Sequence, residues 1–369
     1  MDHQRIAILA HEKFPDRAKT ALGVMRYGDQ EVAAVLDRET AGTRVHDHLV
    51  ESDAATIDDA PITASFAEAL EAKAETEAGA GDGGADDHDI DALLVGIAPI
   101  GGGLDDSWRA DIRAAIEAGC DVVAGLHYFL NEDEEFATLA AEHGVELIDV
   151  RDPHEGLGVA EGRAGDVDAD VICTVGTDCS VGKMTATMEI VAAARDRGID
   201  AAAIPTGQTG ILIEGWGNPI DRVISDFTAG AVEEMILEKG DEHDLLVVEG
   251  QGSIVHPAYS AVTCGILHGS MPDALVLCHA AGREAIHGYE SFELPPIPEY
   301  VDLYEGLSAP VADADVIAGA LNTKDVADDA TARSAVDELA ADLAAPVSDP
   351  VRFGAGPIVE AIEAEVLEE

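Results

Sequence analysis

The stretch that most constrains the fold is Val171–Val191, "VICTVGTDCSVGKMTATMEIV". An apolar run ends at Gly176, a loop containing Gly182 and Lys183 follows, and a helical pattern comes next. This order is typical of a phosphate-binding loop, in which backbone N–H groups, a helix N-terminus and a lysine face an anion. The stretch therefore predicts an α/β domain with a phosphate site at a strand end.

The loop departs from the ordinary pattern GxxxxGK[ST] in two ways. Its glycines are one residue further apart, and Met184 stands where an NTPase places the hydroxyl that binds Mg²⁺. Two interpretations stay open: Thr185 or Ser180 replaces that hydroxyl, or the loop holds a diphosphate that is never cleaved, as in coenzyme A. The departure favours the second. The residues predicted to hold the phosphate are Gly176, Thr177, Asp178, Cys179, Ser180, Val181, Gly182, Lys183, Met184 and Thr185.

The rest of the chain alternates short apolar runs with helical segments, which indicates parallel βαβ units. Strands are expected at residues 5–10, 31–37 and 145–150, twice within 91–127, and at 171–175, 200–206, 244–250, 273–280 and 315–323. A helix entered through a proline is expected over residues 14–28, and a surface loop over 68–89, which is rich in Ala, Glu, Gly and Asp. Residues 151–170, rich in Gly and Asp, indicate a boundary between two domains.

The charge balance narrows the class of protein. The 369 residues include 74 acidic and 21 basic side chains, a formal net charge of −53 that disfavours nucleic-acid binding. Because 47% of the residues are hydrophobic and the acids are spread along the chain, we expect a folded protein with an acidic surface rather than a disordered chain or tail. Such a surface suits high salt, which screens its self-repulsion. We expect a cytoplasmic protein of an extreme halophile.

Cysteine usage and hydropathy also indicate a cytoplasmic protein. The five cysteines are scattered and form no CxxC pair, which indicates a reducing compartment and neither a disulfide framework nor a zinc site. The first ten residues lack a signal-peptide layout, and no apolar run approaches the roughly 20 residues of a membrane helix. We expect neither a membrane nor a metal as partner.

Further polar residues stand where apolar runs end, and ligands of open α/β sheets gather at those ends. Glu249 and His256 follow one run, and suit proton transfer. Thr206 and Gln208 follow another, and suit hydrogen bonds to carboxylates or amides. Candidate substrate-binding cations are Arg222, four residues before Asp226 on an expected helix, and Lys19 and Arg26 in the first half.

Three motifs together carry a family resemblance. "GTDCSVGKMT", "PTGQTGILIEGWG" with "DRVISDF", and "VVEGQGSIVHPAYS" resemble a prokaryotic family long described as a domain of unknown function. Members from marine bacteria and halophilic archaea are assigned as D-glutamate N-acetyltransferases that use acetyl-CoA. The resemblance implies a Rossmann-like N-terminal domain, residues 1–160, followed by a P-loop NTPase-like domain with a mainly parallel sheet, residues 161–369. It also implies that an epimerase-like enzyme receives the product.

On this reading Glu249 is the first candidate base and His256 the second, while Gln208 or a loop N–H group donates to the thioester oxygen. Thr206, Arg222, Lys19 and Arg26 would bind the amino acid. Large parallel-sheet enzymes often self-associate, so we expect a homo-oligomer. Two alternatives remain: an ATP-dependent ligase or carboxylase similar to dethiobiotin synthetase, which would need Mg²⁺, and a nucleotide- or CoA-binding module without activity.

Overall fold

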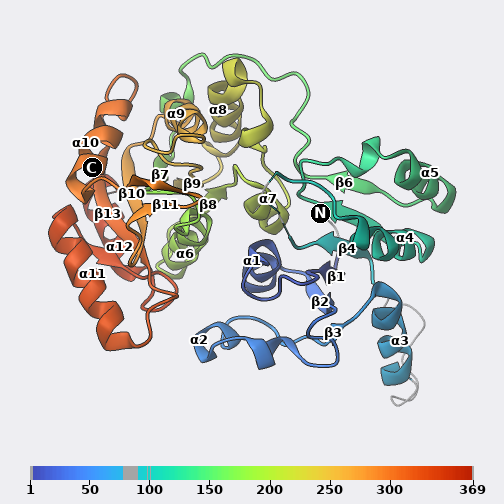
Figure 1. Cartoon of the computed structure of the whole chain (residues 1–369). Coiled ribbons are helices and arrows are strands. Elements are labelled where there is room, and N and C mark those ends of the chain that lie inside the picture. The colour runs from blue at the N-terminus through green and yellow to red at the C-terminus, as the bar shows by residue number, and fades with distance from the viewer. Residues whose placement is uncertain (1–2, 78–89, 98, 100, 368–369) are drawn as a thin grey trace. The chain divides into compact units, whose positions relative to one another are not determined.

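The computed structural model describes residues 3–77, 90–97, 99 and 101–367. The chain forms two compact units (Figure 1), and each is described by itself. The first unit comprises Met1–Asp152 and Ile211–Trp216, and the second comprises Pro153–Gly210 and Gly217–Glu369. Both are α/β units built on a parallel six-stranded sheet, which confirms the predicted fold class.

The first unit has the strand order β3-β2-β1-β4-β5-β6, and all its strand pairs are parallel. Its strands are β1 Arg5–Leu9, β2 Glu31–Leu36, β3 Ile62–Thr63, β4 Ala92–Val95, β5 Asp121–Ala124 and β6 Leu147–Asp149. Its helices are α1 Lys19–Tyr27, α2 Glu51–Ala54, α3 Phe66–Glu77, α4 Arg109–Glu117 and α5 Glu134–His143. This order, with the chain reversing direction beside β1, is that of a Rossmann-like sheet.

Two expectations for this unit are wrong. The helix predicted for residues 14–28 begins only at Lys19, since Ala18 before it has a non-helical backbone (φ −104°, ψ 51°), and it ends at Tyr27. The loop predicted for residues 68–89 is instead helix α3 as far as Glu77, where Ala, Glu and Lys are strong helix formers. Residues 78–89 lie outside the described part of the chain.

The second unit has the order β14-β13-β10-β7-β9-β8, again with parallel pairs only. Its strands are β7 Asp170–Gly176, β8 Ala201–Ile204, β9 Leu245–Val248, β10 Ala274–Ala280, β13 Asp315–Asn322 and β14 Val347–Ser348. Its helices are α6 Lys183–Asp196, α8 Thr228–Lys239, α9 Ser260–Ser270, α10 Ile297–Ser308, α11 Asp329–Leu343 and α12 Gly356–Ile362. An antiparallel hairpin, β11 Ala285–Ile286 and β12 Tyr289–Glu293, follows β10.

The strand order positions the site. Strand β7 lies between β9 and β10 (Figure 1), so the loops after these three strands meet at one edge of the sheet. The chain continues from β7 toward β8 and β9 on one side and later returns to β10 on the other side, so the strand order reverses beside β7. Open α/β sheets bind ligands at such a point. Helix α7, Gln208–Glu214, follows β8 and runs from the second unit into the first. The sequence does not signal this excursion.

Residues 220–227 do not form the expected helix. They form two separate 3₁₀ turns, Ile220–Arg222 and Ser225–Phe227, because Val223 and Ile224 between them have extended backbone. Arg222 and Asp226 therefore do not share a helix face. Among the described residues, no helix combines the length and the apolar character that crossing a membrane requires.

Candidate active site

The loop after β7 has the backbone that its glycines predict. Gly182 lies at φ 108° and Ser180 at φ 57°, both in the left-handed region, and α6 then begins at Lys183. Gly176 leaves room for the lysine to fold back, since a Cβ on residue 176 would stand 2.9 Å from Lys183 Nζ. Gly182 thus supplies the left-handed conformation of the turn, and Gly176 lets the side chain of Lys183 pack closely against the backbone.

Lys183 is buried beneath this loop. Its Nζ donates to the carbonyl oxygens of Asp178, at 2.9 Å, and Gly252, at 2.7 Å. Burial lowers the pKa of its ammonium group. Both acceptors are neutral carbonyl groups, so they do not neutralise the positive charge of Lys183. This buried charge therefore attracts an anion that binds at the loop.

Asp178 fixes the loop and does not face a ligand as a free carboxylate. Its side chain is fully buried, and Oδ2 accepts from Arg283 Nη1 at 2.6 Å and from the backbone N–H of His287 at 2.8 Å. Its Oδ1 accepts from the backbone N–H of Cys179 at 2.7 Å. The carboxylate thus ties the phosphate loop to the connection between β10 and β12.

A layer of aromatic side chains supports the start of the loop. Tyr304 OH donates to the carbonyl of Gly176 at 2.7 Å, and Tyr300 OH donates to the carbonyl of Thr177 at 2.8 Å. The side chain of Thr177 shares a 2.8 Å hydrogen bond with His279 Nδ1. Burial, helped by a nearby arginine, lowers the pKa of His279 to about 4, so the ring is neutral at physiological pH.

Sequence reasoning missed these supporting residues. His279 carries the same signal as Glu249, because it is a polar residue at the end of an apolar strand. Tyr300, Tyr304 and Arg283 carry no such signal, since nothing in their neighbourhood along the chain points to the phosphate loop.

Glu249 lies just past the end of β9 and is buried. Its Oε2 accepts from the backbone N–H groups of Thr206, at 3.2 Å, and Gly207, at 3.1 Å. Burial outweighs these hydrogen bonds and raises the pKa of the carboxyl group to about 7. In the described chain, no donor bonds to Oε1. A carboxyl group with this pKa exchanges a proton near neutrality.

The structure brings other predicted residues to Glu249. Thr206 donates from Oγ1 to the carbonyl of Glu249 at 2.5 Å and accepts from Gln251 Nε2 at 3.3 Å. Gln208 is the first residue of α7, directly after the N–H donor Gly207. A Cβ on residue 210 would stand 2.5 Å from Glu249 Oε2, so a larger residue there would displace this carboxyl group.

His256, in the loop between β9 and α9, approaches the phosphate loop. One of its ring nitrogens, a carboxylate oxygen of Asp178 and Sγ of Cys179 lie within 4.8 Å of one another. His, Cys and Asp are metal-ligand types, but the donor set does not fit. Nδ1 of His256 accepts from two backbone N–H groups, and Asp178 is already paired with Arg283. A metal at Nε2 would need the lone pair there, with the proton on Nδ1.

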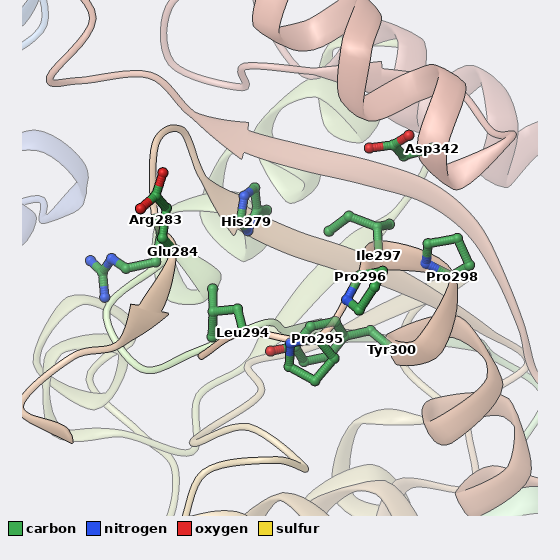
Figure 2. A pocket seen from close by; sticks show the side chains of 10 residues that line it. All are labelled: His279, Arg283, Glu284, Leu294, Pro295, Pro296, Ile297, Pro298, Tyr300 and Asp342. Atoms are coloured by element: carbon green, nitrogen blue, oxygen red, sulfur yellow. The ribbon is translucent and has the colours of Figure 1, made fainter. Parts of the chain in front are cut away.

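A cavity of about 510 Å³ lies beside the loop. Figure 2 shows its wall, with Arg283 and Glu284 on one side of His279 and Ile297 and Pro298 on the other. Its lining residues are His279, Arg283, Glu284, Leu294, Pro295, Pro296, Ile297, Pro298, Tyr300 and Asp342. Three of them contact loop residues: His279 and Tyr300 bond to Thr177, and Arg283 bonds to Asp178. The cavity therefore shares part of its wall with side chains that hold the loop in place.

The three candidate substrate cations are divided between the two units. Arg222 lines a different cavity, of about 370 Å³, whose lining residues are Pro153, His154, Gly156, Leu157, Arg222, Val223, Ile224 and Phe227. Lys19 and Arg26 belong to α1 of the first unit, where Arg26 pairs with Asp53 at 2.5 Å. Of the remaining loop residues, Met184 and Thr185 are half-buried in the first turn of α6, and Ser180 is exposed.

A Rossmann-like unit joined to a parallel sheet with a lysine-bearing glycine loop defines a two-domain P-loop protein. Two family models match this division: a P-loop domain of unknown function, DUF1611, over residues 158–359, and its Rossmann-like N-terminal domain over residues 38–153. The chain belongs to this family, as the resemblance implied.

Three relatives extend the match. Proteins named D-glutamate N-acetyltransferase from Tritonibacter scottomollicae and a Pseudoalteromonas species are each 37% identical. The first match covers 74% of this chain and 81% of the relative, and the second covers 72% and 80%. The crystal structure of a DUF1611 family protein from Anabaena variabilis is similar at TM-score 0.88 and 35% identity, covering 98% of this chain and 99% of that one. The chain is therefore related to enzymes over most of its length.

Proposed function

We propose that this protein transfers the acetyl group of acetyl-CoA to the amine of D-glutamate, giving N-acetyl-D-glutamate. The names of its relatives support the reaction class. The structural observation that carries the proposal is the buried Glu249 carboxyl group, whose pKa of about 7 suits a general base. The reaction belongs to D-glutamate catabolism, and its product passes to an epimerase-like enzyme.

The phosphate loop holds the diphosphate of acetyl-CoA. Its N–H groups and the buried ammonium group of Lys183 bind the two phosphates without cleaving them. Met184, in the position of the usual magnesium-binding hydroxyl, supports a phosphate that is held rather than transferred. No metal is needed. A purine triphosphate bound in the loop with Mg²⁺ is the ligand of the alternative ligase.

Glu249 removes a proton from the substrate. The ammonium group of an amino acid is mostly protonated at neutral pH and cannot attack a carbonyl. Glu249 takes that proton, and the free amine attacks the thioester carbonyl carbon. Holding the two reactants in this geometry supplies much of the rate. Thr206, beside Glu249, binds the amino acid, and Gln208 or a loop N–H group donates to the thioester oxygen.

The chain's charge supports the setting that we propose for the enzyme. A formal charge of −53 suits the cytoplasm of an extreme halophile, and the enzyme works there as a homo-oligomer. Arg222, Lys19 and Arg26 are further candidates for the carboxylates of the substrate. Alanine substitutions at each, compared by KM for D-glutamate, identify which of them binds it.

One assay tests the proposal against its alternatives. The protein is incubated at high salt with D-glutamate and either acetyl-CoA or Mg-ATP, and free thiol and ADP are measured. We expect thiol release that requires D-glutamate, and no ADP. ADP in place of thiol would establish the ligase or carboxylase alternative. Tight acetyl-CoA binding without turnover would establish a binding module.

A further inference from the structure

The hydrogen bonds of His256 determine where its proton sits. Its Nδ1 accepts from the backbone N–H of Ala258 at 3.1 Å and from that of Tyr259 at 3.2 Å. A nitrogen that accepts hydrogen bonds carries a lone pair, and a neutral imidazole carries its one proton on the other nitrogen. The ring is therefore the Nε2–H tautomer. A general base acting at Nε2 would need the opposite arrangement.

The Nε2–H group is a donor without an acceptor. Within the described residues Nε2 makes no hydrogen bond, and it is not among the unpartnered atoms sealed from solvent. The ring is otherwise buried and held by two aromatic neighbours, with ring centroids 4.6 Å away at Tyr259 and 5.2 Å away at Tyr289. His256, one of whose ring nitrogens lies within 4.8 Å of groups on Asp178 and Cys179 in the phosphate loop, thus carries a donor that the described residues do not use.

We propose that His256 donates its Nε2–H to the acyl oxygen of the thioester while negative charge develops there. The proposal rests on the acetyl transfer proposed above and gives His256 a role different from that of a second base. A neutral imidazole is a suitable donor because it is pre-positioned and changes no charge during the reaction.

The step balances as follows. The amine nitrogen forms a bond to the thioester carbon, and the π electron pair moves to the acyl oxygen, which accepts the hydrogen bond from His256. Glu249 holds the proton taken from the ammonium group. When the carbonyl re-forms, the C–S bond breaks and the CoA thiolate leaves. The thiolate takes up the second proton that the attacking nitrogen must lose to become an amide, and Glu249 releases the first proton to solvent. His256 keeps its own proton throughout.

The groups around the ring keep it neutral. Burial lowers the pKa of His256 and Lys183 lowers it further, while the carboxylate of Asp178 raises it. The neighbouring side chains of Cys179, Tyr259 and Tyr289 complete its surroundings. The lowered pKa agrees with the tautomer that the hydrogen bonds define.

Nitrogen NMR tests the tautomer directly. The full-length protein is labelled with ¹⁵N-histidine, and the signals of His256 are identified by their loss in His256→Gln. We expect an unprotonated Nδ1 and a protonated Nε2, unchanged from about pH 7 to about pH 9. A proton on Nδ1, or a doubly protonated ring at pH 7, would overturn the inference whether or not the protein is an acetyltransferase.

Kinetics test the role. In His256→Ala we expect kcat to fall about 10²- to 10³-fold, the usual effect of losing one oxyanion donor, with an unchanged Kd for CoA. His256→Gln, which keeps an N–H donor, should recover part of this loss. Exposed His243, which pairs with Asp200, provides the control substitution His243→Gln.

The pH profile separates donor from base. In wild type we expect kcat to rise with pH around pH 7, where Glu249 loses its proton. This rise should persist in His256→Gln, because His256 does not lose a proton there. Disappearance of that rise would make His256 the base, and a weaker Kd for CoA with unchanged kcat would make it a phosphate ligand. Either result overturns the donor role while acetyl transfer stands. A wild-type protein without transfer overturns the proposed function itself.

Discussion

Gly250 approaches Thr174 so closely that a Cβ atom on residue 250 would stand 1.7 Å from the carbonyl oxygen of Thr174. The N–H of Gly250 donates to Thr174 Oγ1 at 3.0 Å, and the same hydroxyl donates to the carbonyl of Val248 at 3.1 Å. Strand β7, which leads into the phosphate loop, is thereby joined to β9, which leads into Glu249. This close backbone contact therefore fixes the position of the phosphate loop relative to Glu249.

Gly250→Ala should therefore destabilise the second unit. Backbone atoms cannot move aside as a flexible side chain does, so we expect a loss in the free energy of unfolding of about 3 kcal/mol. Denaturant titration at high salt measures it. The matched control is Gly306→Ala, at an exposed position in α10 where a Cβ meets no atom within 4 Å. Alanine there should stabilise by about 0.5 to 1 kcal/mol, as in other helix interiors. Equal effects at the two positions would contradict the close contact.

The buried Glu249 should make stability depend on pH. Its pKa is about 7 in the folded protein against a reference value of 4.5, so the folded state binds the proton more tightly. Its stabilising contribution is complete below about pH 4.5 and is lost as pH rises through 7. Glu249→Gln keeps an oxygen acceptor but does not titrate. We expect the stability of this variant relative to wild type to increase between pH 5 and pH 8 by on the order of 1 to 3 kcal/mol.

Denaturant titrations of both proteins at several pH values test this. Taking the difference between variant and wild type cancels the many other carboxylates of the chain. A difference that is constant with pH would mean that Glu249 titrates in its ordinary range, and it would remove the main support for Glu249 as the base.

The sequence predicted the second unit well because its information is local. The strand, the glycines and Lys183 follow one another directly, and the chemistry of the loop depends on that order. Glu249 was visible for the same reason, as a carboxylate that interrupts the end of an apolar run. Helix α3 was missed because low-complexity composition outweighed the helix-forming character of its Ala, Glu and Lys residues.

The contacts around the loop could not be predicted. Arg283 meets Asp178 across 105 positions of sequence, and Tyr300 meets Thr177 across 123. The strand order β10-β7-β9 creates these contacts, and no periodicity encodes it. The tautomer of His256 depends on hydrogen bonds from Ala258 and Tyr259, which follow from the local backbone and not from residue type.

Lys183→Ala should separate cofactor binding from substrate binding. The ammonium group of Lys183 lies beneath the loop, so its loss should weaken CoA binding by at least tenfold, as expected for a charge-assisted hydrogen bond, and change D-glutamate binding little. Calorimetric titration with each ligand measures this. Lys239→Ala removes a surface lysine that pairs with Glu242 and serves as the control. Equal weakening for both ligands would place the cofactor elsewhere.

Salt should stabilise the protein. With 74 acidic and 21 basic side chains, repulsion between carboxylates exceeds the attraction of ion pairs such as Arg109 with Glu135. The screening length falls from about 10 Å at 0.1 M salt to about 3 Å at 1 M. We expect Tm to rise with KCl over this range, measured by calorimetry. Since the same salt weakens ion pairs, a falling Tm would show that the ion pairs matter more than the net charge.

The ion pair of Arg283 and Asp178 should contribute more than any exposed pair. Arg283→Met leaves a fully buried carboxylate with only two backbone N–H donors, which should cost roughly 2 to 4 kcal/mol, less than the most buried pairs because Arg283 is 24% exposed. Adding Asp178→Asn removes the unpaired charge, so the double variant should recover part of the loss. Arg197→Met, which breaks exposed pairs with Glu360 and Glu363, should change stability by about 1 kcal/mol or less. Denaturant titration of wild type, Arg283→Met, Asp178→Asn and the double variant closes a double-mutant cycle, and strict additivity would show that the two groups do not interact.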